Sequence, residues 1–374
     1  METGQILRHS EPVGTVTAVS ALGLSALDRH GDADSEPGLI DFAVNVRGAP
    51  PDFVLDAVAA SLAGLADYPS AADTERVRAV IGAAHGRPAD QVVLLAGASD
   101  GFAMLPALRP RRAALLQPSF TEPELVLRAA GVPISQVVLD PPWTIDAATI
   151  ARRIPDDADL VVLGNPTNPT SVLHSRRAIE AMRRPGRLIV VDEAFADLTT
   201  DPHTGRRETE SLASVSHADI VVIRSVTKTF GLAGLRAGYL LGAPEVLTRL
   251  TAGRRAWPVS TPALAALAAC ASPAGWAYCD EQARRVAADR AVMIDRLRSA
   301  GITVCSAAAA PFVLIRMSDG IRVKSLLREW GWAVRSCANF VGLDADYIRL
   351  AVRPPAQVDA LVDALVAARE EVRR

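Results

Sequence analysis

The sequence predicts an α/β protein with a larger domain built on a mostly parallel sheet and a smaller α+β domain. Its 374 residues exceed one ordinary domain and suit two that share an interface. Between about residues 90 and 242, short apolar runs alternate with helix-like stretches. After Trp257-Pro258 the sequence becomes rich in alanine and then changes to short strands and helices. Apolar residues make up 49% of the chain and charged residues 22%, as in globular proteins.

Six apolar runs are predicted as strands of the large domain. They span residues 92–97, 113–118, 160–166, 187–194, 220–228 and 237–242. Their hydrophobicity is continuous rather than alternating, which indicates strands covered on both faces. Strands of this kind separated by helical stretches favour a parallel sheet between two helical layers.

The C-terminal part is predicted to contain two helices, then two strands that flank a third helix, and a last helix. The helices lie in TPALAALAACA and DEQARRVAADRAVMIDRLRSAG, and the strands in PFVLIRM and YIRLAVR flank a further helical stretch. The last helix begins at about residue 355. Near the N-terminus, the polar residues 28–38 are predicted as a loop after a helix-like segment.

Charge and composition disfavour several classes of function. The formal charge of −2 leaves no basic stripe for nucleic acid, and the mixed charges provide no membrane-binding patch. No apolar run is long enough to span a bilayer and the N-terminus has no secretory pattern, so we expect a cytoplasmic protein. The four cysteines lack a CxxC spacing and the six histidines lack an HExxH motif, so neither disulfides nor a metal site are expected.

Lysine is rare in this chain. Of its 40 lysines and arginines, only Lys228 and Lys324 are lysine. Nucleotide bias alone would produce such a preference for arginine. A lysine that persists is nevertheless a candidate for chemistry that arginine cannot perform, namely losing its proton and attacking a carbonyl carbon. Lys324 lies in the helical stretch IRVKSLLREW and is expected to be a surface residue.

Polar residues follow four of the predicted strands. In open α/β sheets ligands bind outside the carboxyl ends of the strands, so these residues are expected to converge on one site. They are Ala98-Ser99-Asp100, Thr167-Asn168-Pro169, Asp192-Glu193, and Ser225, Thr227 and Lys228.

A phosphate group fits part of this predicted site. Gly97, Ala98 and Ser99 lie between a strand and a helix, where free backbone N–H groups bind anions, although an ordinary turn capped by Ser99 gives the same pattern. Ser225, Thr227 and the later Arg236 supply two hydroxyls and a guanidinium. The chain contains neither a GxGxxG after a strand nor a GxxxxGK[ST] motif, which disfavours dinucleotide and P-loop sites.

Asp192 ends the most apolar predicted strand. A charge there is costly unless it is paired. A protonated ring nitrogen is one suitable partner, and such a pair maintains a pyridinium as an electron sink. The alternatives are that Asp192 caps the next helix or pairs with an arginine.

Together these motifs resemble the class I/II aminotransferases, a family of fold-type I enzymes that use pyridoxal 5'-phosphate. The matching segments occur in the family's order, and they are AspTyrPro around Tyr68, residues 97–100, 118–120, 165–170, 191–195 and 225–239. The resemblance implies a sheet of the seven-stranded type in a large domain at 48–250. It also implies a small domain from residues 251–374 with a contribution from 1–47.

The resemblance implies a role for each matching residue. Lys228 forms a Schiff base with the cofactor and moves a substrate proton, and Asp192 pairs with the pyridine nitrogen. The remaining cofactor contacts are as follows: Phe120 stacks on the ring; Asn168 bonds its 3-hydroxyl; Ala98, Ser99, Ser225, Thr227 and Arg236 hold the phosphate; and Tyr68 reaches the phosphate of the neighbouring subunit of a homodimer. Without these motifs, Phe120 and Tyr68 would be interpreted as core residues.

A finer resemblance concerns the substrate. Residues 335–353 and 40–45 resemble the threonine-phosphate decarboxylases of the cobalamin pathway, which neighbour the histidinol-phosphate aminotransferases. This implies that Arg349 binds a substrate carboxylate or its counterpart and that Arg335 binds a second anionic group. Asn45 and His30 are possible substrate contacts, although a turn-forming Asn and a surface His are equally compatible.

One departure from the family pattern concerns the cofactor directly. Phe195 replaces the usual tyrosine that donates to the 3-hydroxyl of the cofactor. We therefore expect an aminotransferase that passes an amino group from a phosphorylated amino acid or amino alcohol, such as histidinol phosphate, to a 2-oxo acid. The alternatives are a threonine-phosphate decarboxylase and a cofactor-binding sensor or scaffold without turnover.

Overall fold

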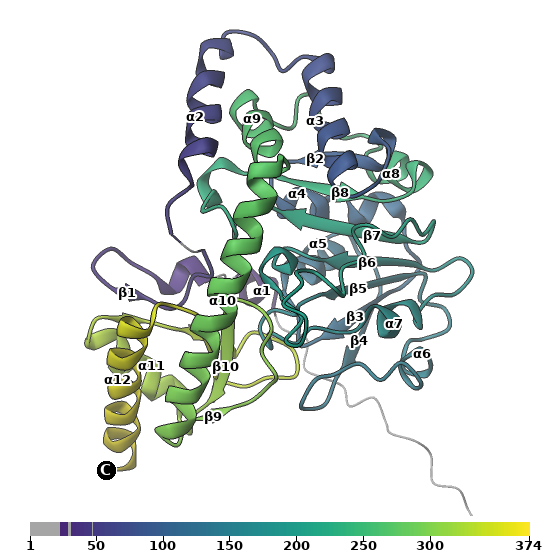
Figure 1. The fold of residues 1–374 in the computed structure, drawn as a ribbon. Helices are drawn as coiled ribbons and strands as arrows, with labels where there is room; N and C mark the ends of the chain where they lie inside the picture. The colour runs from purple at the N-terminus through teal and green to yellow at the C-terminus, as the bar shows by residue number, and fades with distance from the viewer. Residues whose placement is uncertain (1–22, 29–30, 47) are drawn as a thin grey trace, which may run out of the picture.

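The computed structural model describes residues 23–28, 31–46 and 48–374 of the chain. A seven-stranded sheet forms the centre of the larger part (Figure 1). Its spatial order is β2 (Val92–Leu95), β8 (Gly238–Leu241), β7 (Ile220–Ser225), β6 (Leu188–Asp192), β5 (Leu160–Gly164), β3 (Ala113–Gln117) and β4 (Ile134–Val138). The strands from β7 to β4 pair in parallel, and β8 runs antiparallel to both of its neighbours.

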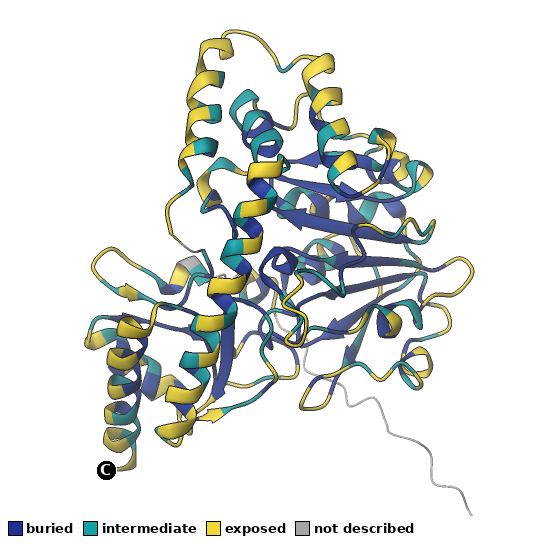
Figure 2. Ribbon diagram, viewed as in Figure 1, coloured by how far each residue is buried: buried dark blue, intermediate teal, exposed yellow. Residues whose placement is uncertain are grey.

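The apolar runs of the sequence become the buried strands of this sheet. All residues of β3, β5, β7 and β8 are buried, which agrees with strands covered on both faces (Figure 2). The six predicted strands are confirmed. The sequence pattern did not reveal β4, because this edge strand has the mixed residues ISQVV, of which only Val137 is buried.

Helices surround the sheet and cover its faces. The α-helices of this part of the chain are α1 (Leu24–Leu27), α2 (Asp52–Ser61), α3 (Ala71–Ala84), α4 (Ala98–Ala103), α5 (Glu122–Ala129), α6 (Ile150–Arg153), α7 (Arg176–Glu180), α8 (Pro244–Leu250) and α9 (Thr261–Cys270). The 3₁₀ helices are η1 (Gly31–Asp34), η2 (Leu62–Gly64), η3 (Ala89–Gln91), η4 (Leu105–Leu108), η5 (Ala196–Leu198) and η6 (Ala233–Leu235). Serine side chains cap the N-termini of several helices. The Ser70 hydroxyl, for example, accepts a hydrogen bond from the Asp73 N–H at 2.9 Å.

The smaller part is an α+β unit, as predicted. An antiparallel sheet joins β12 (Arg335–Ser336), β13 (Tyr347–Ala351), β10 (Phe312–Arg316) and β9 (Thr303–Val304). The helices α10 (Pro273–Ser299), α11 (Gly320–Glu329) and α12 (Pro355–Arg373) pack beside it. The long α10 extends from the larger sheet to the smaller one (Figure 1).

A segment early in the chain joins the smaller part. β1 (Ile40–Asp41) pairs in parallel with β11 (Trp332–Ala333), and Phe42 packs in the same core as Val334 and Leu350. The helix α9, by contrast, packs on α2 and α3, and its Leu264 and Leu267 belong to the core of the large sheet. The chain therefore passes from the larger to the smaller unit along α10.

Candidate active site

A cavity of about 360 Å³ lies at the carboxyl ends of β6 and β7. Its walls contain side chains from the large sheet, from the N-terminal segment and from β13 of the small sheet. The lining residues are Gly31, Val44, Asn45, Val46, Ala98, Ser99, Phe102, Phe120, Glu122, Asn168, Asp192, Ala194, Phe195, Ser225, Thr227, Lys228, Ala233, Arg236 and Arg349. Of the described residues predicted to contact the cofactor or the substrate, all line this cavity except Tyr68 and Arg335.

Asp192 is the last residue of β6 and forms part of the cavity wall. Burial raises the pKa of this carboxyl group to about 7. The hydrogen bond from the Ala194 N–H to Oδ1, at 3.0 Å, acts in the opposite direction, and the charge of Glu122 raises the pKa further. A carboxylate in this environment gains most from a cationic N–H donor inside the cavity.

Two hydroxyl groups and a guanidinium form part of the cavity wall. The Ser225 and Thr227 hydroxyl oxygens lie 2.7 Å apart. Gly97 has a φ of +86°, and a Cβ atom at this position would lie 2.7 Å from Arg236 Nη2, so only glycine allows the guanidinium this close to the start of α4. The donors Ser225, Thr227 and Arg236 form a set suited to a phosphate monoester.

Glu122 is a cavity residue that sequence reasoning missed. It begins α5, and its Oε2 accepts a hydrogen bond from Ser99 Oγ at 3.0 Å. Sequence reasoning does not expect an acidic residue beside a phosphate site, because the two negative charges repel. The only feature of the sequence that pointed to Glu122 was its position two residues after Phe120.

Aromatic rings form the apolar walls. Phe120 packs against Phe102, with ring centroids 6.0 Å apart. Phe195 is 7% exposed and contacts Phe312 edge to face at 5.0 Å. Phe195 therefore completes an apolar wall at the place where the family pattern has a phenolic hydroxyl.

Arg349 reaches the cavity from β13 of the small sheet. Its Nη1 donates to Asn168 Oδ1 and its Nη2 to the Ala43 carbonyl oxygen, both at 2.6 Å. Burial lowers the pKa of Arg349 to about 10, so the side chain remains cationic at neutral pH. Its Nε and the Oδ1 of Asn45 are buried and have no hydrogen-bond partner in the described part of the chain. These two groups can therefore hydrogen-bond a polar ligand in the cavity.

The other predicted residues lie elsewhere. Tyr68 is 74% exposed and stacks on Trp257, with ring centroids 4.2 Å apart. Arg335 is buried and forms an ion pair with Asp34 at 3.2 Å. His30 lies outside the described residues.

Lys324 differs from the prediction of a surface residue. Its side chain is only 20% exposed, and its Nζ lies 2.6 Å from Asp34 Oδ1. A buried carboxylate has drawn the lysine inward, because a charge in the interior is stable only when it is paired.

Some residues predicted to converge on the site face away from it. Glu193 follows Asp192, and side chains alternate along a strand, so Glu193 lies on the other face, where it bonds Arg224 at 2.9 Å. Asp100 pairs with Arg254, and the Thr167 hydroxyl contacts His174 Nε2 at 3.1 Å. These residues stabilise the elements behind the cavity rather than lining it.

Metal-ligand clusters and membrane-spanning helices are absent from the described residues. Among the described residues no cluster of His, Cys, Asp and Glu is arranged to hold a metal ion, and all four cysteines are free. In the same residues, no helix combines the length and apolar character needed to cross a bilayer.

The fold and the cavity define a class of enzyme. A mostly parallel seven-stranded sheet, a lysine after β7 and a carboxylate at the end of β6 are the arrangement of the fold-type I enzymes that use pyridoxal phosphate. The model of the family "Aminotransferase class I and II" matches residues 38–365. The chain belongs to this family of pyridoxal-phosphate-dependent aminotransferases.

Comparisons with individual proteins agree with this assignment. A histidinol-phosphate aminotransferase of Mycobacterium tuberculosis is 48% identical over 95% of this chain and 96% of its own length. A threonine-phosphate decarboxylase of Salmonella typhimurium is 29% identical over 87% and 90%, respectively. The crystal structure of the histidinol-phosphate aminotransferase from Clostridium acetobutylicum superposes with a TM-score of 0.79 at 26% identity, covering 89% of this chain and all of that one.

The residues present fit pyridoxal phosphate. The cavity offers a carboxylate with a raised pKa for a pyridinium, an aromatic ring at its wall and a group of phosphate donors. Gly97 leaves the space that these donors require. The cofactor predicted from the sequence is thus the cofactor that the family uses.

Proposed function

We propose that this aminotransferase accepts the amino group of histidinol phosphate and passes it to a 2-oxo acid. The observation that carries the proposal is the cavity itself, whose wall brings together Lys228, Asp192, a phosphate-type donor set and the cationic Arg349. The 48% identity to proteins named histidinol-phosphate aminotransferases, over nearly the full length of both chains, supports this choice of substrate.

The hydrogen-bond donors of the cavity wall indicate where the cofactor phosphate would bind. Ser225, Thr227 and Arg236, with the backbone of Ala98 and Ser99, would hold the phosphate of pyridoxal phosphate. Asp192 would accept a hydrogen bond from the protonated ring nitrogen, and the charge of that nitrogen would bring the carboxyl group to its ionised form. When bound, the cofactor supplies an electron sink that stabilises negative charge at the substrate α-carbon.

Lys228 is the proposed catalytic residue. Its amine would bond the cofactor aldehyde carbon and, once substrate has displaced it, would carry the proton between carbon atoms. The Oδ1 of Asn168 accepts a hydrogen bond from Arg349, and its amide N–H group would donate to the cofactor's 3-oxygen. Phe120 and Phe195 would exclude water from the ring.

Arg349 is the proposed anchor for the anionic group of the substrate. Its present acceptors are a neutral amide and a backbone carbonyl, so its charge has no carboxylate partner in the described residues. A phosphate or carboxylate group accepts from a guanidinium more strongly than either of these. The buried Asn45 side chain would contribute a second polar contact.

The second candidate is decarboxylation of threonine phosphate. It is favoured by the full-length similarity to the decarboxylase of Salmonella typhimurium. Both reactions would use the same residues to hold the cofactor, and both act at the α-carbon of the substrate. They differ in which bond lies perpendicular to the cofactor ring, so the substrate contacts around Arg349 decide between them.

We further propose a cytoplasmic homodimer in which Tyr68 contacts the cofactor phosphate of the neighbouring subunit. Tyr68 and Trp257 form an exposed aromatic pair, with 74% and 57% of their surfaces accessible in the single chain. A pair of this kind is typical of an interface. Within each subunit the cofactor would lie between the large domain at 48–250, extended by α9, and a small domain formed by residues 1–47 and the chain from α10 onward.

A substrate panel tests the proposed reaction. The purified protein is incubated with 2-oxoglutarate and, separately, histidinol phosphate, threonine phosphate and common amino acids. Glutamate is expected from histidinol phosphate. Release of carbon dioxide from threonine phosphate without glutamate would establish the decarboxylase in its place. The Lys228→Ala variant is the matched control, because it removes the reacting amine and should give neither product.

A further inference from the structure

The loop that carries Asn168 is closed at its base by two hydrogen bonds between Asn165 and His174. The His174 backbone N–H donates to Asn165 Oδ1 at 2.8 Å, and Asn165 Nδ2 donates to the His174 carbonyl oxygen at 3.2 Å. Both residues are buried, so these bonds lie in the protein interior. Asn168 itself lines the active-site cavity. The loop therefore begins and ends at a fixed place behind the side chain that it presents.

The His174 side chain contacts the loop one residue before Asn168. Its Nε2 lies 3.1 Å from the Thr167 hydroxyl oxygen. The Thr167 backbone N–H donates to the Val172 carbonyl oxygen at 2.9 Å, and the Thr167 carbonyl oxygen accepts from the Ser171 N–H at 2.7 Å. Because Thr167 and Asn168 share a peptide bond, a shift of Thr167 would also move the Asn168 side chain.

The hydrogen bonds of Thr167 decide which nitrogen of His174 carries the proton. The Thr167 hydroxyl donates its only proton to the Gly164 carbonyl oxygen at 2.9 Å, so it can only accept from His174 Nε2. Burial lowers the pKa of His174 to about 4, so the ring is neutral at neutral pH and has one N–H. That proton lies on Nε2, and Nδ1 is therefore an acceptor.

His174 also lines a second cavity, of about 10 Å³, together with Trp143 and Thr170. Two buried nitrogens of this group, His174 Nδ1 and Trp143 Nε1, have no hydrogen-bond partner in the described part of the chain. They are complementary, because the indole N–H can only donate and Nδ1 accepts. The Thr170 hydroxyl accepts from the Val172 N–H at 3.4 Å and keeps its own proton for a further acceptor.

One water molecule fits both the volume and the polar groups of this cavity. A volume of about 10 Å³ is close to the lower limit for one water, and a buried water has about two to four partners. Here the water would accept from Trp143 Nε1 and donate to His174 Nδ1, with the Thr170 hydroxyl as a third partner. Without such a partner, two buried polar atoms would be unpaired, which is unfavourable.

From these contacts we infer that Trp143 and His174 form a binding site for one buried water, and that His174, oriented by this water, is a positioning residue for Asn168. The water keeps Nδ1 as an acceptor, which leaves the Nε2 proton for Thr167. Thr167 in turn fixes the backbone from which the Asn168 amide group would donate to the cofactor's 3-oxygen. The inference rests on the proposed contact between Asn168 and the cofactor.

Two substitutions separate the roles of the two ring nitrogens of His174. In His174→Gln, the side-chain amide lies near the place of Nε2 and can still donate to Thr167. In His174→Asn, the amide lies near the place of Nδ1 and can contact the water, but the contact with Thr167 is lost. Both variants lose the packing of the ring, so a purely structural role would affect them alike.

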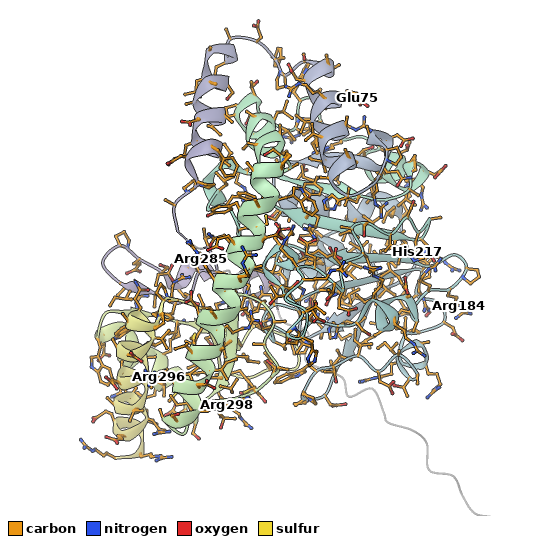
Figure 3. All side chains as sticks on the ribbon, viewed as in Figure 1. Glu75, Arg184, His217, Arg285, Arg296 and Arg298 are labelled. Atoms are coloured by element: carbon orange, nitrogen blue, oxygen red, sulfur yellow. The ribbon has the colours of Figure 1, made fainter. Side chains whose placement is uncertain are left out.

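The readout is the pH midpoint of the cofactor's visible absorbance, because a hydrogen bond to the 3-oxygen stabilises its anionic form and lowers this midpoint. His174→Asn should raise the midpoint by about 0.5 pH unit, and His174→Gln by less than about 0.2. Asn168→Ala removes the donor itself and should raise it by about one unit. The matched control is His217→Asn, which should leave the midpoint unchanged. His217 bonds Glu180 at 2.9 Å and does not line either cavity (Figure 3).

A crystal structure of the wild-type protein tests the water site without any variant. We expect one ordered water at about 2.7–3.2 Å from both Trp143 Nε1 and His174 Nδ1. The water should be present with and without cofactor, so this test does not depend on cofactor binding. Electron density that shows a direct bond between the two rings, or nothing between them, would overturn the water site.

Other results would overturn the role of His174. Equal midpoint shifts in His174→Asn and His174→Gln would show that the contact with Thr167 does not position Asn168. Thr167→Val removes the acceptor of Nε2 and should raise the midpoint by about 0.5 pH unit, so an unchanged midpoint there refutes the role even if no His174 variant folds.

An unchanged midpoint in Asn168→Ala would instead refute the proposed contact between Asn168 and the cofactor, and with it the positioning role. None of these measurements depends on which substrate the enzyme accepts. A failure of the proposed substrate is therefore distinguishable from a failure of this inference.

Discussion

Replacing Asp192 by Asn should destabilise the loaded enzyme but stabilise the protein without cofactor. Burial raises the pKa of Asp192 from 3.8 to about 7. Because the folded-state pKa exceeds the unfolded value, the stability contribution is fully present below pH 3.8 and is lost as the pH rises through 7. Asparagine does not ionise and retains an oxygen for the hydrogen bond from the Ala194 N–H.

The size of the effect follows from the rise in the pKa of Asp192 from 3.8 to about 7. This rise lowers the free energy of unfolding, relative to a side chain that stays neutral, by about 4 kcal/mol at pH 8 and by about 1.5 kcal/mol at pH 5. These values are upper bounds, because Asp192 lines the cavity and is partly accessible to water there. Without cofactor, Asp192→Asn should therefore be more stable than the wild type, by an amount that grows between pH 5 and pH 8.

Urea unfolding of both proteins, with and without pyridoxal phosphate, measures this difference. Adding cofactor should reverse its sign, because the pyridinium then compensates the charge of Asp192 and the asparagine variant lacks that pair. Asp359→Asn serves as the control, since its carboxylate is exposed. A difference that is absent at pH 8, or constant across the pH range, would refute the account of Asp192.

Four further changes test other parts of the structure. In steady-state assays, Arg349→Met should raise the Km for substrate by at least about tenfold, because a charge-assisted contact is lost. The control Arg298→Met changes an exposed residue on the last turn of α10 (Figure 3) and should change Km less than about twofold. Arg224→Met should lower the free energy of unfolding by about 3–5 kcal/mol in urea titrations, because it leaves three buried carboxylates without their shared cation. Phe195→Tyr should lower the pH midpoint of the cofactor's visible absorbance by about one unit, since the added phenol donates to the cofactor's 3-oxygen; an unchanged midpoint in a pH titration would place the hydroxyl elsewhere. Tyr68→Ala should weaken cofactor retention during dialysis without a loss in unfolding free energy above about 0.5 kcal/mol, because Tyr68 is 74% exposed in the single chain.

The sheet was predictable because its strands are continuous apolar runs. Residues at the ends of these runs, such as Asp192 and Lys228, could be assigned to one site because parallel strands present their carboxyl ends together. The edge strand β4 was not predictable in this way, because half-buried strands have mixed sequences. The side of the strand on which Glu193 lies follows from alternation along β6 only once the register of the sheet is known.

The substrate end of the site depended on contacts between distant residues. Asp34 and Arg335 are separated by three hundred and one positions in the sequence, and nothing local indicates that they form an ion pair. A second contact of the same carboxylate, with Lys324, explains why this lysine is less exposed than expected. Long-range pairing of charges is decided by the tertiary fold, so the sequence pattern identified Arg335 as a cation but not its partner.

The central claim is that Lys228 bonds the cofactor, and it can be tested in one experiment. The cofactor-loaded protein is reduced with borohydride, digested and analysed by mass spectrometry. Lys324 is the only other lysine in the chain and lies in a pair with Asp34, so it serves as an internal control. The account predicts one pyridoxyl adduct, on Lys228, that disappears in Lys228→Ala. An adduct on Lys324, or one that survives in Lys228→Ala, would contradict it.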